Sequence, residues 1–431
     1  MGHPALRFRP GGPKIFKALL FPLLLFALAS CVSRGPVTVE PSASRQAADS
    51  GTAPGAGSWT PAVNSPAAST STPAPQLLLA PTPSPVLTVP PPSPSITLTA
   101  QIASSSASQG VIRVSFQPWE LALAVAWSPD GRTLAVAAGD RIYLVDAQTY
   151  QVEGYFAPGA FSYSLAYSPD GRLLAACSRD GFVRLWSTTE LPAGVAAQPA
   201  SALPEPKLAF SAHRKGCNAL AFSPDGLLLA SGGNDSMTKV WDVHTGKVLS
   251  QIIGGSYAVP GIAFRPDGTA LAILNGLVMR LREVKTGRML GTLRGDAPFY
   301  SVAFSPDGYW LALGDSDNTV RVWQAEAALN RGVGAGPVGT ILKSHTGKPG
   351  TPAALVWALV FSPDSRLLAS AGGDGTIRLW DVANASLLET LGGFSGAATS
   401  LDFSPDGRIL ASGSLDAGVY FLSLPDVSSL P

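Results

Sequence analysis

Charged and metal-binding side chains are scarce in this chain. Only 14% of its 431 residues are charged, against about a quarter in typical soluble domains. With three cysteines and four histidines, a Cys/His zinc module has almost nothing to be built from. Lys and Arg are scattered and the net charge is +1, whereas nucleic-acid-binding proteins concentrate positive charge. We therefore expect no metal, no other cofactor and no nucleic-acid partner.

Long apolar runs are also missing, apart from one near the N-terminus. Four basic residues (Arg7, Arg9, Lys14 and Lys17) precede an apolar run of 12 residues at 18–29. This run is too short to span a membrane, which takes about 20 apolar residues in a helix. Its length and its basic flank are typical of a secretory signal peptide.

The apolar run ends in Leu28-Ala29-Ser30-Cys31, which resembles the lipobox of bacterial lipoproteins. The resemblance implies that residues 1–30 are removed and that diacylglycerol is attached to the sulfur of Cys31. Two acyl chains anchor a protein stably where one is marginal. Ordinary cleavage after Ser30, or an uncleaved signal anchor, is the alternative. A lipoprotein would be extracytoplasmic, and the choice between inner and outer membrane stays open.

Residues 31–110 have the composition of a disordered tether. The 79 residues from Val32 to Gly110 hold 14 prolines and only four charged side chains. Such a segment cannot bury enough apolar surface to offset its conformational entropy. It is either a spacer that lifts a globular head off the membrane or a wall-spanning, low-complexity segment of no tuned length.

From residue 111 the chain repeats itself. A Ser-Pro-Asp-Gly tetrapeptide, or a one-residue variant of it, begins at residues 128, 168, 223, 265, 305, 362 and 404. These starts are 40, 55, 42, 40, 57 and 42 residues apart. A period near 40 residues has room for about four short strands and none for a helix.

Each repeat has the same internal pattern. An alternating segment such as 219–222 leads into the turn, where Pro suits the first central position and Gly takes a positive φ. A second strand follows, as at 227–231, and a third ends in Trp, as at 238–242.

The stretch 372–381, Gly-Gly-Asp-Gly-Thr-Ile-Arg-Leu-Trp-Asp, together with Phe-Ser-Pro-Asp at 361–364, resembles the signature of WD-repeat β-propellers. The resemblance implies an all-β, seven-bladed propeller over 111–425, followed by a short tail at 426–431. Four repeats carry the characteristic Trp, at 186, 241, 323 and 380. The first, fourth and seventh repeats are degenerate, with Val145, Leu281 and Leu422 in its place.

A propeller must close its ring, because an open blade exposes unpaired backbone groups. The seventh repeat ends with its third strand, so one strand is missing there. The segment 112–116 is an extra strand before the first repeat. We expect it to pair with the last blade.

One repeat contains residues that superficially resemble a nucleophilic triad, His213, Ser231 and Asp235. The family resemblance implies instead that these three residues and Trp241 form a buried hydrogen-bond network that ties one blade together. No Gly-x-Ser-x-Gly elbow surrounds Ser231. A second copy of the network is expected at His345, Ser370, Asp374 and Trp380.

Other candidate sites also have structural interpretations. The seven Pro-Asp carboxylates, from Asp130 to Asp406, recur at one position and are expected to be turn residues. The segment 315–318 begins like a calcium loop, but Val320 replaces the required Gly, which favours a turn. Cys177 and Cys217 lie in neighbouring repeats and form either a disulfide or two buried apolar thiols.

In the family, partners commonly bind at a position four residues before the aromatic end of each first strand. In this chain the position holds Leu123, Tyr163, Asn218, Pro260, Tyr300, Trp357 and Thr399. Loops nearby add Trp119 and Tyr257. The predicted partner-binding residues are Tyr163, Tyr300, Trp357, Asn218, Trp119 and Tyr257. Alternatively, the aromatic rings only plug the channel. The two insertions, 188–206 and 325–339, should lie on the opposite face.

These residues predict a monomeric, membrane-anchored, extracytoplasmic WD-repeat scaffold of the bacterial cell envelope. It would bind a protein partner, whose identity stays open, through one face, and it would not be an enzyme. One alternative is an envelope sensor or binding protein for sugar or peptide ligands. Another is a propeller hydrolase or lyase with a site at the channel mouth. Such a site needs converging acidic, basic or histidine side chains, and the seven ring positions hold none.

Overall fold

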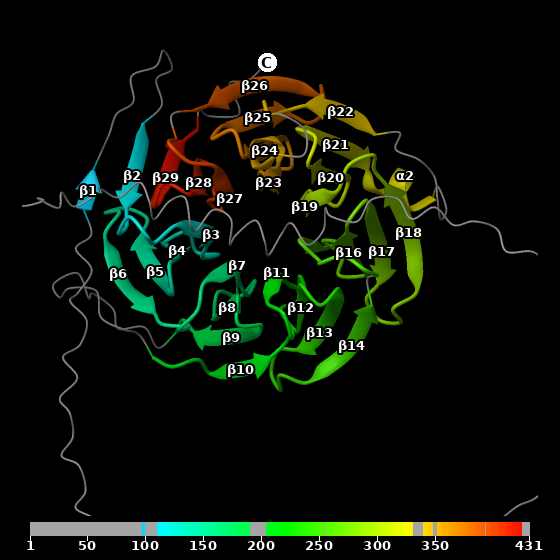
Figure 1. Cartoon of the computed structure of the whole chain (residues 1–431), viewed down its shortest axis with the longest axis horizontal. Coiled ribbons are helices and arrows are strands. Elements are labelled where there is room, and N and C mark those ends of the chain that lie inside the picture. The colour runs from blue at the N-terminus through cyan, green and yellow to red at the C-terminus, as the bar shows by residue number, and fades with distance from the viewer. Residues whose placement is uncertain are drawn as a thin grey trace, which may run out of the picture. The chain divides into compact units, whose positions relative to one another are not determined.

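A computed structural model of the chain describes residues 97–99, 110–189, 204–253, 255–330, 339–347, 351–392 and 394–424. Within these ranges, seven antiparallel sheets are arranged around a central axis (Figure 1). The helical elements there are α2 (Ala325–Asn330) and one turn of 3-10 helix (Pro352–Ala354). The expected all-β, seven-bladed propeller is confirmed. Several predicted parts lie outside the described residues: the signal peptide at 1–30, Cys31, the tether apart from 97–99 and Gly110, and the tail at 426–431.

Each blade begins at the axis and ends at the outer edge (Figure 1). Blade 1 contains β3 (Ala122–Trp127), β4 (Thr133–Ala138), β5 (Arg141–Asp146) and β6 (Val152–Phe156). Blade 2 contains β7 (Ser162–Tyr167), β8 (Leu173–Ser178), β9 (Phe182–Ser187) and β10 (Leu208–Ser211). Blade 3 contains β11 (Cys217–Phe222), β12 (Leu228–Gly233), β13 (Met237–Asp242) and β14 (Val248–Ile253).

Blades 4 to 6 repeat this order. Blade 4 contains β15 (Ile262–Phe264), β16 (Ala270–Asn275), β17 (Val278–Glu283) and β18 (Met289–Arg294). Blade 5 contains β19 (Phe299–Phe304), β20 (Trp310–Asp315), β21 (Thr319–Gln324) and β22 (Thr340–Lys343). Blade 6 contains β23 (Val356–Phe361), β24 (Leu367–Gly372), β25 (Ile377–Asp381) and β26 (Ser386–Leu391). The segment 316–318 is the turn between β20 and β21, as expected from Val320.

Blade 7 is built from both ends of the domain. It contains β27 (Ala398–Phe403), β28 (Ile409–Ser414) and β29 (Gly418–Ser423), and β2 (Val111–Ser115) pairs with β29 as its fourth strand. Val114 lies opposite Val419 and is fully buried. The prediction that an N-terminal strand closes the ring is therefore confirmed.

A fifth strand lies inside the range that we expected to be disordered. The strand β1 (Thr97–Thr99) pairs antiparallel with β2, with Leu98 opposite Val114. The outer edge of β2 offers unpaired backbone groups, and two of the three residues of β1 are β-branched, which suits a strand.

The repeated turn explains why the first and second strands pair so regularly. In blade 1, the Ser128 hydroxyl donates to Asp130 at 2.6 Å and accepts from the amide of Thr133 at 3.0 Å, while Asp130 accepts from the amide of Arg132 at 3.1 Å. Gly131 takes a φ of +70°, which glycine adopts without steric cost. Blade 6 has Ser365 at this position with a φ of +64°.

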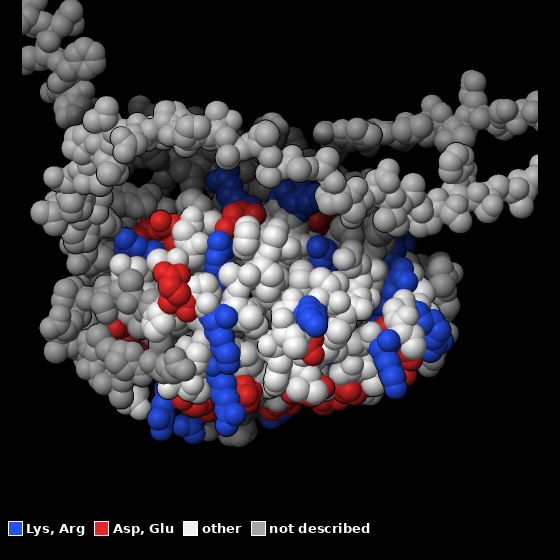
Figure 2. Space-filling model, turned by 90° about the horizontal axis from the view of Figure 1, so that it is seen from below, with Lys and Arg blue, Asp and Glu red and all other residues white. Residues whose placement is uncertain are grey.

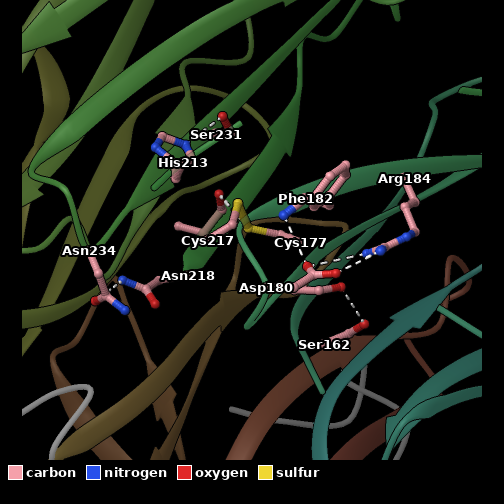
Figure 3. Close-up of a disulfide and its surroundings, with 12 residues drawn as sticks. Ser162, Cys177, Asp180, Phe182, Arg184, His213, Cys217, Asn218, Ser231 and Asn234 are labelled. Carbon is pink, nitrogen blue, oxygen red and sulfur yellow. Dashed lines mark hydrogen bonds and ion pairs between the residues drawn. A yellow bond between two sulfur atoms is a disulfide. The ribbon is translucent and has the colours of Figure 1, made fainter. Parts of the chain in front are cut away.

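A disulfide joins blades 2 and 3. Cys177 on β8 is bonded to Cys217 on β11, with their Cα atoms 5.3 Å apart (Figure 3). Both residues are fully buried in a cluster that includes Leu229 and Trp241. Of the two alternatives for this pair, the structure has the disulfide rather than two free thiols.

The described helices do not reach across a membrane: none is long and apolar enough. The apolar run at 18–29 is not among the described residues.

Candidate binding face of the propeller

We call the side on which the first strands begin the entry face, and the side of the Pro-Asp-Gly turns the turn face. On the entry face, six of the seven first strands contain a β-bulge. The register with the second strand skips one residue in each, namely Leu123, Tyr163, Asn218, Tyr300, Trp357 and Thr399. These are six of the seven ring positions identified in the sequence. A bulge redirects the side chain of the extra residue, so the backbone sets these residues apart from the rest of each strand.

Blade 4 is the exception. Its first strand begins only at Ile262, and Pro260 precedes it. Proline has no amide N–H to donate to the second strand, so it does not belong inside a paired strand. The ring of bulges is therefore interrupted at this blade.

Two of the predicted aromatic residues meet on the entry face. The rings of Tyr300 on β19 and Trp357 on β23 lie 6.5 Å apart at an interplanar angle of 58°, across the boundary of blades 5 and 6. Both side chains are half-buried. The indole nitrogen of Trp357 is buried and has no hydrogen-bond partner among the described residues.

The other predicted residues of this face differ in their surroundings. Trp119 and Tyr257 are 60% and 40% exposed, on the loops before β3 and β15. Tyr163 is half-buried, and this burial raises the pKa of its hydroxyl. Asn218 donates to the side-chain oxygen of Asn234 at 2.8 Å, so its amide is used within blade 3.

The four residues of the predicted hydrogen-bond network lie in contact in blade 3. His213 places Nδ1 2.9 Å from Asp235 and Nε2 2.9 Å from the hydroxyl of Ser231, which also accepts from the indole N–H of Trp241 at 2.9 Å. Burial lowers the pKa of His213 and outweighs the opposing effect of Asp235, so the ring is neutral. Ser231 is fully buried. A hydroxyl in this position cannot reach a substrate, which argues against a nucleophilic triad.

Gly181 of blade 2 positions this histidine. The amides of Ala212 and His213 both donate to the carbonyl of Gly181 at 2.9 Å. Gly181 has a φ of +84°, and a Cβ there would lie 1.9 Å from the carbonyl oxygen of His213. The turn between β8 and β9 therefore holds the network of the next blade, close to the disulfide (Figure 3).

Blade 6 contains the second copy of the network. His345 places Nδ1 3.0 Å from Asp374 and Nε2 3.0 Å from Ser370, and the indole of Trp380 donates to Ser370 at 3.1 Å. The carboxylate of Asp374 also accepts from the amide of Thr346 at 2.8 Å. Although burial opposes it, hydrogen bonding by His345 and Thr346 lowers the pKa of Asp374.

Sequence reasoning missed two substitute networks, in the blades on either side of the closure. In blade 1, the hydroxyl of Tyr143 donates to Glu120 at 2.7 Å, and Arg141 lies 3.8 Å from the same carboxylate oxygen. In blade 7, Tyr420 donates to Asp416 at 2.5 Å and Arg113 lies 3.4 Å from Asp416. The available signal was a Tyr two residues before the degenerate Trp position, where the four repeats that carry the Trp have Lys or Arg.

The turn face carries the seven Pro-Asp carboxylates, all of them exposed. Seen from the side, acidic side chains follow one edge of the molecule (Figure 2). In six of the seven the pKa is lowered: Asp130, Asp170, Asp225, Asp267, Asp307 and Asp406. The largest cause at Asp170, Asp225 and Asp406 is a hydrogen bond from the turn Ser. At the other three, burial opposes the shift and hydrogen bonds outweigh it.

One further carboxylate stands apart from this set. Asp402 on β27 accepts from the amide of Trp127 on β3 at 2.7 Å, across the closure. Burial raises its pKa to about 7 against the effect of that hydrogen bond. No group of three or more His, Cys, Asp or Glu within the described ranges could hold a metal ion.

The insertions at 188–206 and 325–339 lie only partly within the described residues. The amide of Thr188 donates to the carbonyl of Arg172 at 3.0 Å, and that of Ala325 to Tyr309 at 2.7 Å. Arg172 and Tyr309 directly follow turn glycines, so both insertions leave the sheets at the turn face.

The comparisons with known proteins agree with this architecture. The family model "WD domain, G-beta repeat" matches residues 156–187, 204–242, 287–324, 338–381 and 385–421. These segments contain the first three strands of blades 2, 3, 5 and 6, and those of blade 7 except for the last two residues of β29. Blades 1 and 4 are unmatched. The register of blade 4 puts Arg282 at the Trp position, because Leu271 lies opposite Arg282 as Leu229 lies opposite Trp241, so the assignment of Leu281 to this position was wrong. Blade 7 is matched up to the residue before Leu422.

Several curated proteins are similar to this chain. Periodic tryptophan protein 2 of Arabidopsis thaliana is 33% identical over 184 residues, which are 41% of this chain and 19% of that protein. Autophagy-related protein 16 of the same plant is 30% identical over 171 residues, 38% and 30% of the two chains. Small ribosomal subunit protein RACK1y of Oryza sativa subsp. japonica is 29% identical over 175 residues, 40% and 49% of the two chains. The chain thus spans about half or less of each of these relatives, and it is a seven-bladed β-propeller of the WD-repeat type.

Proposed function

We propose that this protein is a lipid-anchored, extracytoplasmic scaffold that binds a protein partner through the entry face of its propeller. The observation that carries the binding proposal is the ring of β-bulges. Tyr163, Tyr300 and Trp357 are the extra residues of three of these bulges, at the ends of first strands that lie at the entry face. Aromatic residues grouped in this way are typical of the residues that supply most of the binding energy in protein interfaces. The WD-repeat match also favours a protein-interaction scaffold.

The disulfide supports the proposed location. Disulfides persist in oxidising compartments and are rare in the cytosol, where thiols are kept reduced. The pair of Cys177 and Cys217 is therefore compatible with export, which the basic and apolar N-terminal segment also favours. In this proposal Cys31 carries the lipid.

Affinity capture from native membranes tests the binding face. The baits are the mature protein, the variant Tyr163→Ala/Tyr300→Ala/Trp357→Ala, and a control with Leu249→Ala, which removes an exposed apolar side chain from the outer strand β14. We expect the wild type and the control to capture the same few proteins and the triple variant to lose them. Identical captures by all three baits, with cooperative melting retained, would show that the aromatic ring only fills the channel.

Metabolic labelling with a fatty-acid analogue tests the anchor. The wild type should be labelled and should sediment with membranes, whereas Cys31→Ser should be neither labelled nor retained. A labelled Cys31→Ser protein would overturn the assignment of the lipid to this cysteine, and an unlabelled wild type would overturn the anchor itself.

A further inference from the structure

The turn face has a cavity of its own, at the end of the channel opposite the entry face. It has a volume of about 430 Å³ and lies among the first strands of blades 2 to 6. Ligand pockets typically measure about 300–1,000 Å³. The aromatic ends of five first strands line it, together with three turn prolines: Tyr167, Phe222, Phe264, Phe304 and Phe361, and Pro169, Pro224 and Pro306.

Small side chains line the cavity in its three middle blades. One position before the aromatic residue, blades 3, 4 and 5 have Ala221, Ala263 and Ala303, which all line the cavity. Blade 6 has the larger Val360 at this position. The space that bulkier residues would fill in these three blades is left to an occupant.

Of the five blades that line the cavity, blades 3, 4 and 5 lack an arginine directly after the turn, whereas blades 2 and 6 have one. In blades 1, 2, 6 and 7 an arginine follows the turn: Arg132, Arg172, Arg366 and Arg408. In blades 3, 4 and 5 the same position holds Leu227, Thr269 and Tyr309. Leu227 and Tyr309 are 53% and 51% exposed. This sector therefore combines uncompensated negative charge with exposed apolar surface.

The Lys and Arg side chains of blades 3 to 5 on the turn face either form ion pairs or lie at the outer edge of the propeller. Arg265 is 3.3 Å from Asp267 and 2.5 Å from Glu326. Lys247, Lys285 and Arg288 lie on turns between third and fourth strands, which are at the outer edge (Figure 1). Arg288 pairs with Glu283 at 3.4 Å. Arg265 is thus shared between Asp267 and Glu326, and Asp225 and Asp307 form no ion pair among the described residues, so the turns of blades 3 to 5 keep a net negative charge.

We propose that this cavity binds a segment of a second protein in which an aromatic or aliphatic side chain is flanked by Lys or Arg. The apolar side chain enters among the phenylalanine rings, and the flanking cations face the three aspartates. This site is separate from the entry face, so the propeller presents two binding surfaces at opposite ends of one channel.

Fluorescence anisotropy of labelled synthetic peptides on the mature protein tests the proposal. The probe peptides carry one Phe, Leu or Trp between Lys/Arg pairs, and the matched peptides replace the cations by Glu or the apolar residue by Ser. We expect only the cationic peptides with an apolar residue to bind, and we expect their affinity to fall with salt. Equal binding of the acidic peptides, or no binding of any peptide, would overturn the proposal.

Two sets of variants separate the apolar and the charged contributions. Ala303→Leu fills the cavity without changing any charge and should weaken binding at least tenfold. Asp225→Asn/Asp267→Asn/Asp307→Asn keeps the turn hydrogen bonds and should weaken binding by a similar factor while removing most of its salt dependence. Asp130→Asn/Asp406→Asn is the matched control and should bind like wild type. If the triple and the control variants bind alike, the carboxylates of blades 3 to 5 have no special role and the proposal fails.

The entry-face variant Tyr163→Ala/Tyr300→Ala/Trp357→Ala distinguishes the two sites. It should bind the probe peptides as the wild type does, even if it loses the partners captured from membranes. A loss of peptide binding in this variant would place the peptide on the entry face and overturn the proposal of a second site.

Discussion

The tryptophans at the ends of the third strands do not share one environment. Trp241 and Trp380 donate to a serine on the second strand. The indole N–H of Trp323 is buried and has no partner among the described residues. In this blade Leu313 occupies the position that the serine has in blade 3. Leu313 lies opposite Arg321, and Ser231 lies opposite the equivalent Lys239. A Trp in the repeat therefore does not by itself indicate the hydrogen-bond network.

Removing the serine of either network should destabilise the domain. Ser231→Ala leaves a buried histidine nitrogen and a buried indole N–H without their partner, which costs about 1–3 kcal/mol. Ser370→Ala should cost a similar amount, and the two effects should add because the networks share no residue. Denaturant unfolding measures both, with Ser211→Ala on an exposed strand position as control. Losses no larger than that of the control would contradict the structural role.

Asp402 should make stability depend on pH. Its pKa is about 7 in the folded protein and near 3.9 in an unfolded chain. Between these values the unfolded state releases its proton first, so this group lowers stability as pH rises through this window. Asp402→Asn should be more stable than wild type at pH 8, by at most about 4 kcal/mol, because each unit of pKa difference corresponds to about 1.4 kcal/mol, and the gain should vanish near pH 4.

This difference is measured by unfolding both proteins at several pH values, because other titrating groups contribute equally and cancel. Asparagine keeps an oxygen that can accept from the amide of Trp127. A gain that is the same at every pH would show that Asp402 does not titrate in this window.

At the scale of the element, the closing strand should determine the stability of the whole ring. Deleting 111–117 removes β2 and the buried side chains of Val114 and Phe116, and it exposes the edge of β29. We expect a lower melting temperature for the entire domain in one transition. Deleting 97–99 removes only the outermost strand and should have a much smaller effect. Normal melting of the 111–117 deletion would count against the closure.

The strand order could be predicted from the sequence because each repeat contains its own turn signals. The Ser-Pro-Asp-Gly tetrapeptides fix where first strands end, and the missing last strand identified 112–116 as its replacement. By contrast, Thr97–Thr99 pairs through backbone groups of β2, and three residues in a Pro-rich segment carry too little pattern to predict that.

The candidate sites were predictable only in part, because a repeat pattern shows what lies within one repeat and not what distant segments form together. The networks of His213 and His345 follow from positions within one repeat. Those of Tyr143 and Tyr420 depend on a carboxylate from a loop, and the network of Tyr420 also on Arg113 from the other end of the domain. The cavity of the turn face arises from five blades together, so no single repeat shows it.

At the scale of the whole molecule, the disulfide should stabilise the ring. It links residues 40 positions apart in two blades, and a bond of this kind contributes about 2–4 kcal/mol. Unfolding of the wild type should shift to lower denaturant concentration when a reductant is added. Cys177→Ser/Cys217→Ser should start from the lower value and should not respond to reductant. A response of both proteins, or of neither, would show that the bond is absent or contributes nothing.

The pairing of β2 with β29 also determines the order in which this chain can fold during its synthesis. The strand β2 is synthesised before all the other strands of the seven blades apart from β1 and has its partner about 300 residues later, so no intermediate length of the chain can complete the ring. Closing so long a segment is entropically costly, and folds dominated by distant contacts form slowly. A nascent chain therefore stays open until its last blade is available. Under the proposed export, this delay would keep the chain flexible while it crosses the membrane.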